Sequence, residues 1–279
     1  MRIAIIAPIS VAVPPVAYGG TEAIIDELAR GYADAGHEVV VFTTGDSTCP
    51  VERRFIYPEA QGDAIGAAVP ELRHVMFAYE DLSGFDIVHD HTTIGPAYAR
   101  AFPHLRVVVT AHNPFDHDRA DIYADLAPNV AVVAISEAHA KSAPEVKVTR
   151  VIHHGIDPTT YFFGSGNGGF ALFLGRMSPD KGAHRAIAVA KAAGVPLIMA
   201  AKMRTPEEHA YFRAHVEPHL GEDIFYAGEA PRLRKAEMLA NARCLLFPIR
   251  WPEPFGLVML EALASGTPVL GGSGRRAPG

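Results

Sequence analysis

The stretch "FALFLGRMSPDKGAHRAIAVAKAAGVPLIMAAK", residues 170–202, decides the fold class. Its two ends, 170–176 and 196–202, are apolar runs of strand length, and residues 182–194 between them carry apolar side chains at helical spacing. Strand, helix and strand in this order are typical of two parallel strands joined by a crossover helix. Because the strands are apolar throughout, we expect an α/β fold with a parallel sheet covered by helices on both faces.

The same rhythm continues on both sides of this stretch. Before it we predict strands at 2–8, 37–44, 85–91, 106–112, 130–136 and 149–156, with helices at 19–36, 70–82 and 95–102. After it we predict helices at 206–220, 232–242 and 255–266, with strands at 223–228, 243–249 and 268–272. The segment "FFGSGNGG", residues 162–169, is rich in Gly and Ser and separates the two series. We therefore predict two doubly wound domains, residues 1–165 and 166–279, with ligands bound in a cleft between them, beyond the carboxyl ends of the strands.

Composition narrows the class of protein. The chain has 279 residues, 49% of them hydrophobic, and a mean hydropathy of +0.11, which indicates a compact soluble protein and excludes general disorder. No apolar run approaches the roughly 20 residues that span a bilayer, and the apolar start is too short for a secretory signal. We expect a cytoplasmic protein, with peripheral membrane contact left open. Cys49 and Cys244 are expected to be free thiols.

The charge of the chain is distributed unevenly. The net charge is −6; residues 1–169 have 11 Lys+Arg against 21 Asp+Glu, or −10, and residues 170–279 have 14 against 10, or +4. A basic second half suits a ligand that carries phosphate, whereas an acidic first half disfavours nucleic acid or an anionic membrane as its partner.

The stretch "RWPEPFGLVMLEALASGTPV", residues 250–269, places acids at the start of a helix that we expect near Phe255. First-turn N–H groups lack intrahelical partners, so a phosphate or a sugar oxygen is stabilised there. Glu253, just ahead of the helix, can accept hydrogen bonds from sugar hydroxyls. Glu261 lies in an apolar helix, where an acid is costly unless something pairs with it. The alternative is that Glu253 caps the helix and Glu261 is a solvated surface acid.

The stretch "LGRMSPDKG", residues 174–182, places Arg176 and Lys181 around a turn at the end of a strand. Two cations there can converge on a diphosphate. The alternative is two solvated loop cations.

The first half offers a glycine loop and three histidines. In "PPVAYGGTE", residues 14–22, Gly19 and Gly20 let the backbone approach a ligand closely, and Thr21 is a good N-cap, although no G-x-G-x-x-G follows the first strand. His112 ends one predicted strand, and His89 and His91 end its neighbour. Each could hydrogen-bond a sugar hydroxyl or move a proton, or could be a structural histidine.

We predict no metal site. His89 and His91 have a spacing that metals use, but no third ligand with clear motif spacing follows. The acidic pair in "DHD", residues 116–118, is interpreted as a chance occurrence in a loop.

These motifs together resemble glycosyltransferase family 4, retaining enzymes of the GT-B fold. "EPFGLVMLEALASGTPV" resembles the Glu-x7-Glu motif of that family, "GRMSPDKG" its phosphate-binding segment, and "YGGTE" its glycine loop. The resemblance implies catalytic roles for His112, Glu253, Arg176 and Lys181. It implies that the donor is bound by Gly19, Gly20, Arg176, Lys181, Glu253, Phe255, Gly256, Leu257, Val258 and Glu261. It makes His91, His112 and Asn113 candidates on the acceptor side, with "FYAGEAP", residues 225–231, near the base.

The implied reaction moves a sugar from a nucleotide-diphosphate sugar to a small-molecule, glycan or lipid acceptor, without cofactor, metal or nucleic acid. A UDP-sugar is favoured, and GDP- and ADP-sugars stay open. Two alternatives remain, a nucleotide-sugar epimerase of the same fold and a nucleotide-sugar-binding remnant without turnover. Members of the family normally continue for about another hundred residues. We therefore expect an incomplete second domain, whose exposed flank would be covered in a homo-oligomer.

Overall fold

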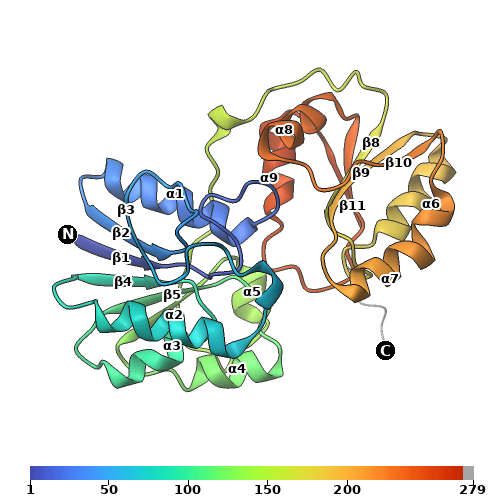
Figure 1. Cartoon of the computed structure of the whole chain (residues 1–279). Helices are drawn as coiled ribbons and strands as arrows, with labels where there is room; N and C mark the ends of the chain where they lie inside the picture. Colours follow the sequence, from blue (N-terminus) through green and yellow to red (C-terminus); the bar gives the residue numbers. More distant parts are fainter. Residues whose placement is uncertain (273–279) are drawn as a thin grey trace. The chain divides into compact units, whose positions relative to one another are not determined.

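The computed structural model describes residues 1–272, and the chain divides into two compact units, Met1–Gly155 and a second unit from Ile156 onward (Figure 1). Each unit is built on one parallel sheet. No helix within the described residues is long and apolar enough to cross a membrane.

The first unit contains a seven-stranded sheet in the order β3-β2-β1-β4-β5-β6-β7, with every neighbouring pair parallel. Its strands are β1 (Arg2–Ile6), β2 (Glu38–Thr43), β3 (Glu52–Phe55), β4 (Ile87–Asp90), β5 (Val107–Ala111), β6 (Val130–Ala134) and β7 (Val148–Val151). Its α-helices are α1 (Gly20–Asp34), α2 (Ala68–Glu80), α3 (Gly95–Tyr98), α4 (His117–Ala124) and α5 (Glu137–Lys141).

Alternate residues of β1 pack on opposite faces of this sheet. Ile3 and Ile5 belong to the core cluster under α1, whereas Ala4 and Ile6 belong to the cluster under α2 and α3. Figure 1 shows α1 on one side of the sheet and α2, α3 and α4 on the other. Full burial of an Ile side chain contributes about 1.5–3 kcal/mol to the stability of the fold. Because β1 has buried apolar side chains on both faces, this one strand stabilises the helix layers on both sides of the sheet.

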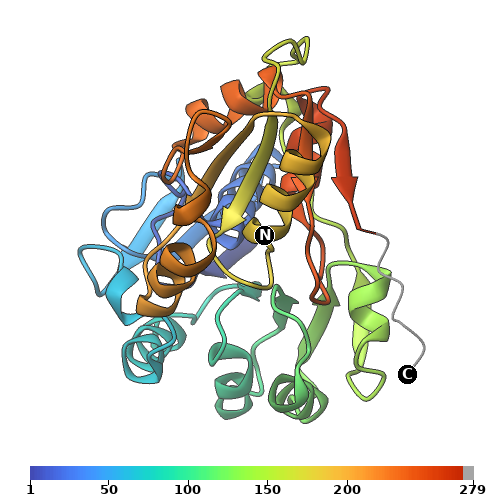
Figure 2. The ribbon, with the colours of Figure 1, turned by 90° about the vertical axis from the view of Figure 1, so that its right-hand side faces the viewer.

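The second unit contains a five-stranded parallel sheet in the order β10-β9-β8-β11-β12. Figure 2 shows the last strand, drawn in red, at the edge of this sheet. The strands are β8 (Ala171–Arg176), β9 (Leu197–Lys202), β10 (Ile224–Tyr226), β11 (Cys244–Phe247) and β12 (Val269–Gly271). The α-helices are α6 (Ala183–Ala193), α7 (Pro206–His215), α8 (Arg232–Asn241) and α9 (Leu257–Ala264).

The second sheet is also covered on both faces. Ala171 and Phe173 of β8 pack in the cluster with α6 and α7, and Leu172 and Leu174 pack in the cluster with α8 and α9. The predicted α/β class with two doubly wound parallel sheets is therefore confirmed.

The segment that joins the two sheets packs on the second unit. Gly164 N donates to Ser265 O at 3.0 Å, and Gly168 N donates to Asn241 O at 2.8 Å. These backbone hydrogen bonds explain why the compact units divide between Gly155 and Ile156, ahead of the boundary at residue 165 that we expected from the Gly/Ser-rich composition.

One strand and two α-helices of the first unit were missed from sequence. Strand β3 reads "ERRF", a charged segment that pairs only along the edge of the sheet, so it lacks the apolar run of a central strand. Helices α4 and α5 are short. The "DHD" segment is not in a loop as expected, because Asp116 is the N-cap of α4 and accepts from Arg119 N.

Candidate functional site

The strand order of the second sheet reverses between β8 and β11. These two parallel strands are neighbours, although β9 and β10 lie between them in sequence. The loop that follows β11 is hydrogen-bonded to the loop after β8 and to the first turn of α6. Arg185 Nε donates to Pro248 O at 2.7 Å, and Arg250 N donates to Asp180 O at 3.2 Å. Ligands of open α/β sheets bind outside the strand ends at such a switch point.

Lys181 and Glu253 form an ion pair across these two loops. Lys181 Nζ lies 2.5 Å from Glu253 Oε2, and the two side chains are 16% and 17% exposed. The indole Nε1 of Trp251 donates to the same carboxylate oxygen at 2.8 Å. We call Lys181, Trp251 and Glu253 the Glu253 cluster. The alternatives of a solvated Lys181 and of Glu253 as a helix cap are therefore wrong, since α9 has Gly256 as its N-cap with no side-chain cap.

Arg176 is the last residue of β8 and precedes Lys181 in the same segment of the sequence. Its guanidinium contacts Asp180 Oδ2 at 3.1 Å, Ser178 Oγ at 3.3 Å and Glu208 Oε1 at 3.7 Å. The Arg176 side chain is 40% exposed, so part of the guanidinium can still meet a ligand. Asp180 and Glu208 fix its direction.

Helix α9 begins at Leu257, two residues later than the Phe255 expected from sequence. Gly256 has φ +83 and occupies the left-handed region, which breaks the helix before Leu257. A Cβ on Gly256 would lie 2.5 Å from Met259 Cε and 3.2 Å from Phe247 Cζ. Phe255 and Leu257 are half-buried, and Val258 packs against the core under α8 and α9.

Glu261 is 6% exposed, which excludes the surface-acid interpretation. Lys235 Nζ lies 2.6 Å from Glu261 Oε1, and the Tyr161 hydroxyl donates to the same oxygen at 2.9 Å. We call Tyr161, Lys235 and Glu261 the Glu261 cluster. The cost of burying this acid is thus offset by a cation and a hydroxyl, as an acid in an apolar helix requires.

In the first unit the glycine loop follows β1, where the strand order reverses between β1 and β4. Helix α1 begins at Gly20 with Gly19 as its N-cap and no side-chain cap, so Thr21 is not the N-cap that we expected. A Cβ on Gly19 would lie 2.7 Å from Pro15 Cβ, so the loop is too tight for a larger residue. Gly20 is exposed.

Four histidines of the first unit form a row of neighbouring rings, His89, His91, His112 and His154. Ring centroids are 4.1 Å apart for His89 and His91, 5.1 Å for His91 and His112, and 5.2 Å for His112 and His154. His91 Nδ1 and His112 Nε2 share a hydrogen bond of 2.8 Å. The structure thus brings together the histidines that ended two predicted strands, and adds His154 to them. Asn113 follows this row and is exposed.

Burial keeps the histidine row neutral. Desolvation lowers the pKa of His89 and of His154 to about 4. Desolvation, and then the neighbouring histidines, hold the pKa of His91 and of His112 well below 6.5. Each ring can therefore donate or accept a hydrogen bond at neutral pH without a charge. Within residues 1–272 no group of three or more His, Cys, Asp or Glu side chains could hold a metal ion.

Two family models match successive parts of the chain. Residues 18–160 match the model described as Glycosyltransferase Family 4, and residues 164–277 match Glycosyl transferases group 1. The chain belongs to glycosyltransferase family 4. It is therefore a glycosyltransferase, and its two units have the GT-B fold.

Individual relatives agree with this family. YtcC of Bacillus subtilis (strain 168), a presumed glycosyltransferase by its name, is 23% identical over 98% of this chain and 76% of its own length. The crystal structure of AviGT4, a glycosyltransferase involved in avilamycin A biosynthesis, is 26% identical with a TM-score of 0.68, over 97% of this chain and 78% of that one. Anabaena HepE in complex with UDP and glucose is 19% identical with a TM-score of 0.72, over 96% and 80%.

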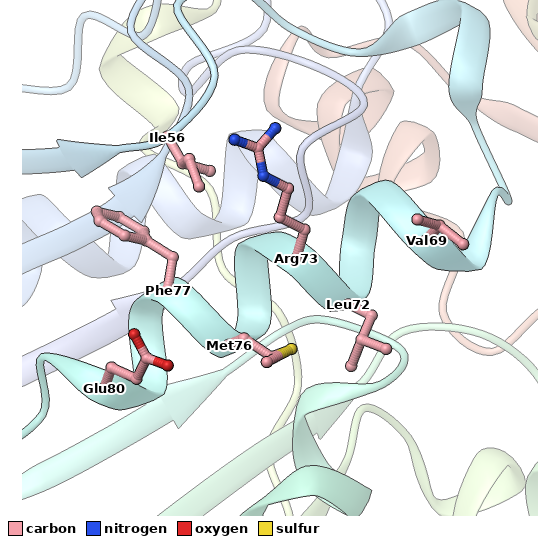
Figure 3. A pocket seen from close by; sticks show the side chains of 7 residues that line it. All are labelled: Ile56, Val69, Leu72, Arg73, Met76, Phe77 and Glu80. Carbon is pink, nitrogen blue, oxygen red and sulfur yellow. The ribbon is translucent and has the colours of Figure 1, made fainter.

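A hollow of about 340 Å³ lies along α2 of the first unit (Figure 3). Figure 3 shows Arg73 and Phe77 on the side of α2 that faces Ile56, with Leu72 and Met76 on the opposite side. None of the site residues predicted from sequence lines it. Arg176 instead ends β8, Lys181 and Glu253 lie in the loops after β8 and β11, and Glu261 lies on α9.

Sequence reasoning missed the residues that hold the two motif acids. Trp251, Lys235 and Tyr161 each contact Glu253 or Glu261, yet none was singled out. A signal was present for Trp251, since it stands two residues before Glu253 and is the single Trp of the chain. Lys235 and Tyr161 lie 26 and 100 residues from Glu261, and no spacing rule connects them.

Proposed function

We propose that this glycosyltransferase takes its sugar from a nucleotide-diphosphate sugar. The Lys181–Glu253 ion pair is the observation that carries the proposal. It places a cation suited to a diphosphate and a carboxylate suited to sugar hydroxyls side by side, at the switch point of the second sheet. The second unit is accordingly the proposed donor domain, and the first the proposed acceptor domain.

Arg176 and Lys181 are the proposed partners of the diphosphate. When the bond between sugar C1 and the phosphate oxygen breaks, its electron pair stays on that oxygen, and the leaving group gains negative charge. Fixed cations stabilise such charge where it develops. Arg176 can do so with a directed fork of N–H groups and Lys181 with a compact charge. We propose that no metal ion is required for this step.

The remaining second-unit residues are proposed to hold the sugar and the ribose. Glu253 would accept from sugar hydroxyls through Oε1, since its two hydrogen-bond donors in the described chain both lie on Oε2. The backbone of Phe255, Gly256 and Leu257 would line the sugar and phosphate, with Val258 nearby. Glu261 would bind the ribose hydroxyls through Oε2.

The first unit is proposed to supply the acceptor side. Gly20, with Gly19 before it, would approach the donor phosphate through its backbone. His112 would contact the sugar and the acceptor, and His91, which shares a hydrogen bond with it, would fix its ring. Asn113 is exposed next to them and is a further acceptor contact.

We propose transfer with retention of configuration. The acceptor oxygen bonds to C1 on the face from which the diphosphate leaves, and the acceptor proton passes to the departing phosphate oxygen. A double-displacement route would need a carboxylate nucleophile about 5 Å from a second acid. Glu253 and Glu261 are instead engaged by Lys181 and Lys235.

A UDP-sugar is the first donor to test, because HepE, of the same fold, has been solved with UDP-glucose. GDP- and ADP-sugars follow. We would screen the three classes by calorimetry and follow sugar release by mass spectrometry, with Glu261→Ala as the paired variant. Selective binding of one nucleotide, lost in Glu261→Ala, together with slow release of sugar is the expected result. No binding to any class by folded protein would overturn the proposal.

A further inference from the structure

Trp251 occupies a fixed position in the loop between β11 and α9. Glu253 N donates to Trp251 O at 2.8 Å, which closes a tight turn, and Arg250 N donates to Asp180 O in the neighbouring loop. The indole is half-buried. Its ring therefore stands on backbone that is anchored on both sides.

The Trp251 side chain makes two different contacts within the Glu253 cluster. Its N–H donates to Glu253 Oε2 at 2.8 Å, and its ring face lies under the Lys181 ammonium, with 4.5 Å from Nζ to the ring centroid. Lys181 is thus shared between a carboxylate and an aromatic face. Oε2 of Glu253 is shared between an ammonium and an indole N–H.

These contacts have a consequence for the proposed function, on which this inference rests. A diphosphate that recruits Lys181 draws the ammonium away from Glu253, because one flexible lysine cannot be held equally by both. Glu253 would then lose its charged partner at the moment when it must hold the sugar. The indole N–H is the donor that remains on Oε2.

We propose that Trp251 is a positioning residue that keeps Glu253 directed at the donor sugar while Lys181 moves from Glu253 to the diphosphate. With Oε2 retained by the indole, Oε1 stays available to accept from sugar hydroxyls. Trp251 itself touches neither the sugar nor the phosphate in this scheme. Its contribution is specific to the sugar, because the diphosphate depends on Arg176 and Lys181.

The first test separates sugar from diphosphate. Trp251→Phe keeps an aromatic face for Lys181 and removes the N–H. By calorimetry on the full chain, UDP should bind Trp251→Phe within about 3-fold of the unchanged protein. The additional affinity of UDP-glucose over UDP should fall about 10-fold, and KM for UDP-glucose should rise more than kcat falls, as expected when a hydrogen bond that supports sugar binding is lost. If UDP does not bind, the same comparison is made with GDP and GDP-glucose, or with ADP and ADP-glucose.

Equal losses of UDP and UDP-glucose affinity would show that Trp251 only packs the loop, and would overturn the inference. So would a Trp251→Phe variant with unchanged sugar affinity and kcat. Either result leaves the proposed function standing, because the unchanged protein still binds the nucleotide. If no nucleotide binds the unchanged protein, the proposed function fails and this inference fails with it.

The second test uses the fluorescence of the chain. Trp251 is its single tryptophan, so emission reports this position alone. UDP should change the emission as the ammonium leaves the ring face. Lys181→Met should show altered emission without ligand and little further change at saturating UDP, as followed by calorimetry. UDP binding that leaves the emission unchanged, or an equal response in Lys181→Met, would contradict the movement of Lys181.

Discussion

Lys181 Nζ and Glu253 Oε2 lie 2.5 Å apart although 72 residues separate them in sequence. Neighbouring strands β8 and β11 make this possible, since each residue follows one of them. The pair joins the phosphate-binding segment to the Glu-x7-Glu motif. Its two members should therefore respond differently to mutation.

Lys181→Met and Glu253→Gln should shift UDP affinity in opposite directions. Lys181→Met removes a phosphate partner, so UDP should bind about 10-fold more weakly and turnover should fall about 10²–10³-fold. Glu253→Gln frees Lys181 for the diphosphate, so UDP should bind equally well or more tightly while turnover falls. Calorimetry with UDP and the rate of sugar release measure both. Lys147→Met, an exposed lysine of the first unit, is the control. Equal weakening by both variants would contradict the expectation.

The Glu261 cluster should show strong coupling in stability. Lys235→Met leaves a 6% exposed carboxylate with only the Tyr161 hydroxyl, which should lower the free energy of unfolding by about 1–3 kcal/mol. The double variant Lys235→Met/Glu261→Gln removes the unpaired charge and should be more stable than Lys235→Met alone. Urea unfolding of Lys235→Met, Glu261→Gln and the double variant gives the coupling energy. Additive losses would argue against the pair.

Acid should destabilise the first unit through the histidine row. The pKa of His89 and His154 is about 4 in the folded chain against 6.5 for an ordinary histidine, so the unfolded state binds more protons as the pH falls below 6.5. Stability is thus full above pH 6.5 and is lost progressively toward pH 4, by about 1–2 kcal/mol per histidine at pH 5. Urea unfolding at pH 7.5 and pH 5.0 measures the loss.

His154→Gln is the paired variant for the acid experiment. It removes one titrating ring from the row, so the difference in stability between pH 7.5 and pH 5.0 should shrink. An unchanged difference would mean that other groups cause the acid sensitivity.

Gly256→Ala tests whether the left-handed turn positions the donor site. Ala at φ +83 costs about 1–2 kcal/mol, and its Cβ would also displace Met259. We expect lower stability together with at least 10-fold weaker UDP binding. Gly194→Ala is the matched control, because Gly194 also has a positive φ, +60, but nothing lies within 4 Å of its Cβ. It should lose stability and keep UDP affinity. Equal UDP binding by both variants would exclude a role for the turn.

The architecture was predictable because the central strands are continuous apolar runs and the covering helices have helical periodicity. Where that pattern is weak the prediction failed, as for the charged edge strand β3 and for the short helices α4 and α5. The start of α9 was placed two residues early because helical spacing alone does not show that Gly256 adopts a left-handed conformation.

The candidate site was predictable in its motifs and not in its contacts. Arg176 and Lys181 stand out as two cations after an apolar strand, Glu253 as an acid just ahead of a helix, and Glu261 as an acid within an apolar helix. Which cation meets which acid depends on strand order, and periodicity does not reveal strand order. We expected Glu261 to have a partner, because a buried acid needs one. The identity of that partner, Lys235 of α8, depends on the tertiary structure and could not be predicted from sequence.

The cations of the site are already paired with carboxylates, and this pairing affects how diphosphate binding depends on ionic strength. Arg176, Lys181 and Lys235 each have a carboxylate within 4 Å before any ligand arrives. An incoming diphosphate would exchange one anionic partner for another and release few counterions into solution. Its affinity should therefore decline only gently as salt is added, whereas proteins that meet phosphates with unpaired cations lose affinity steeply.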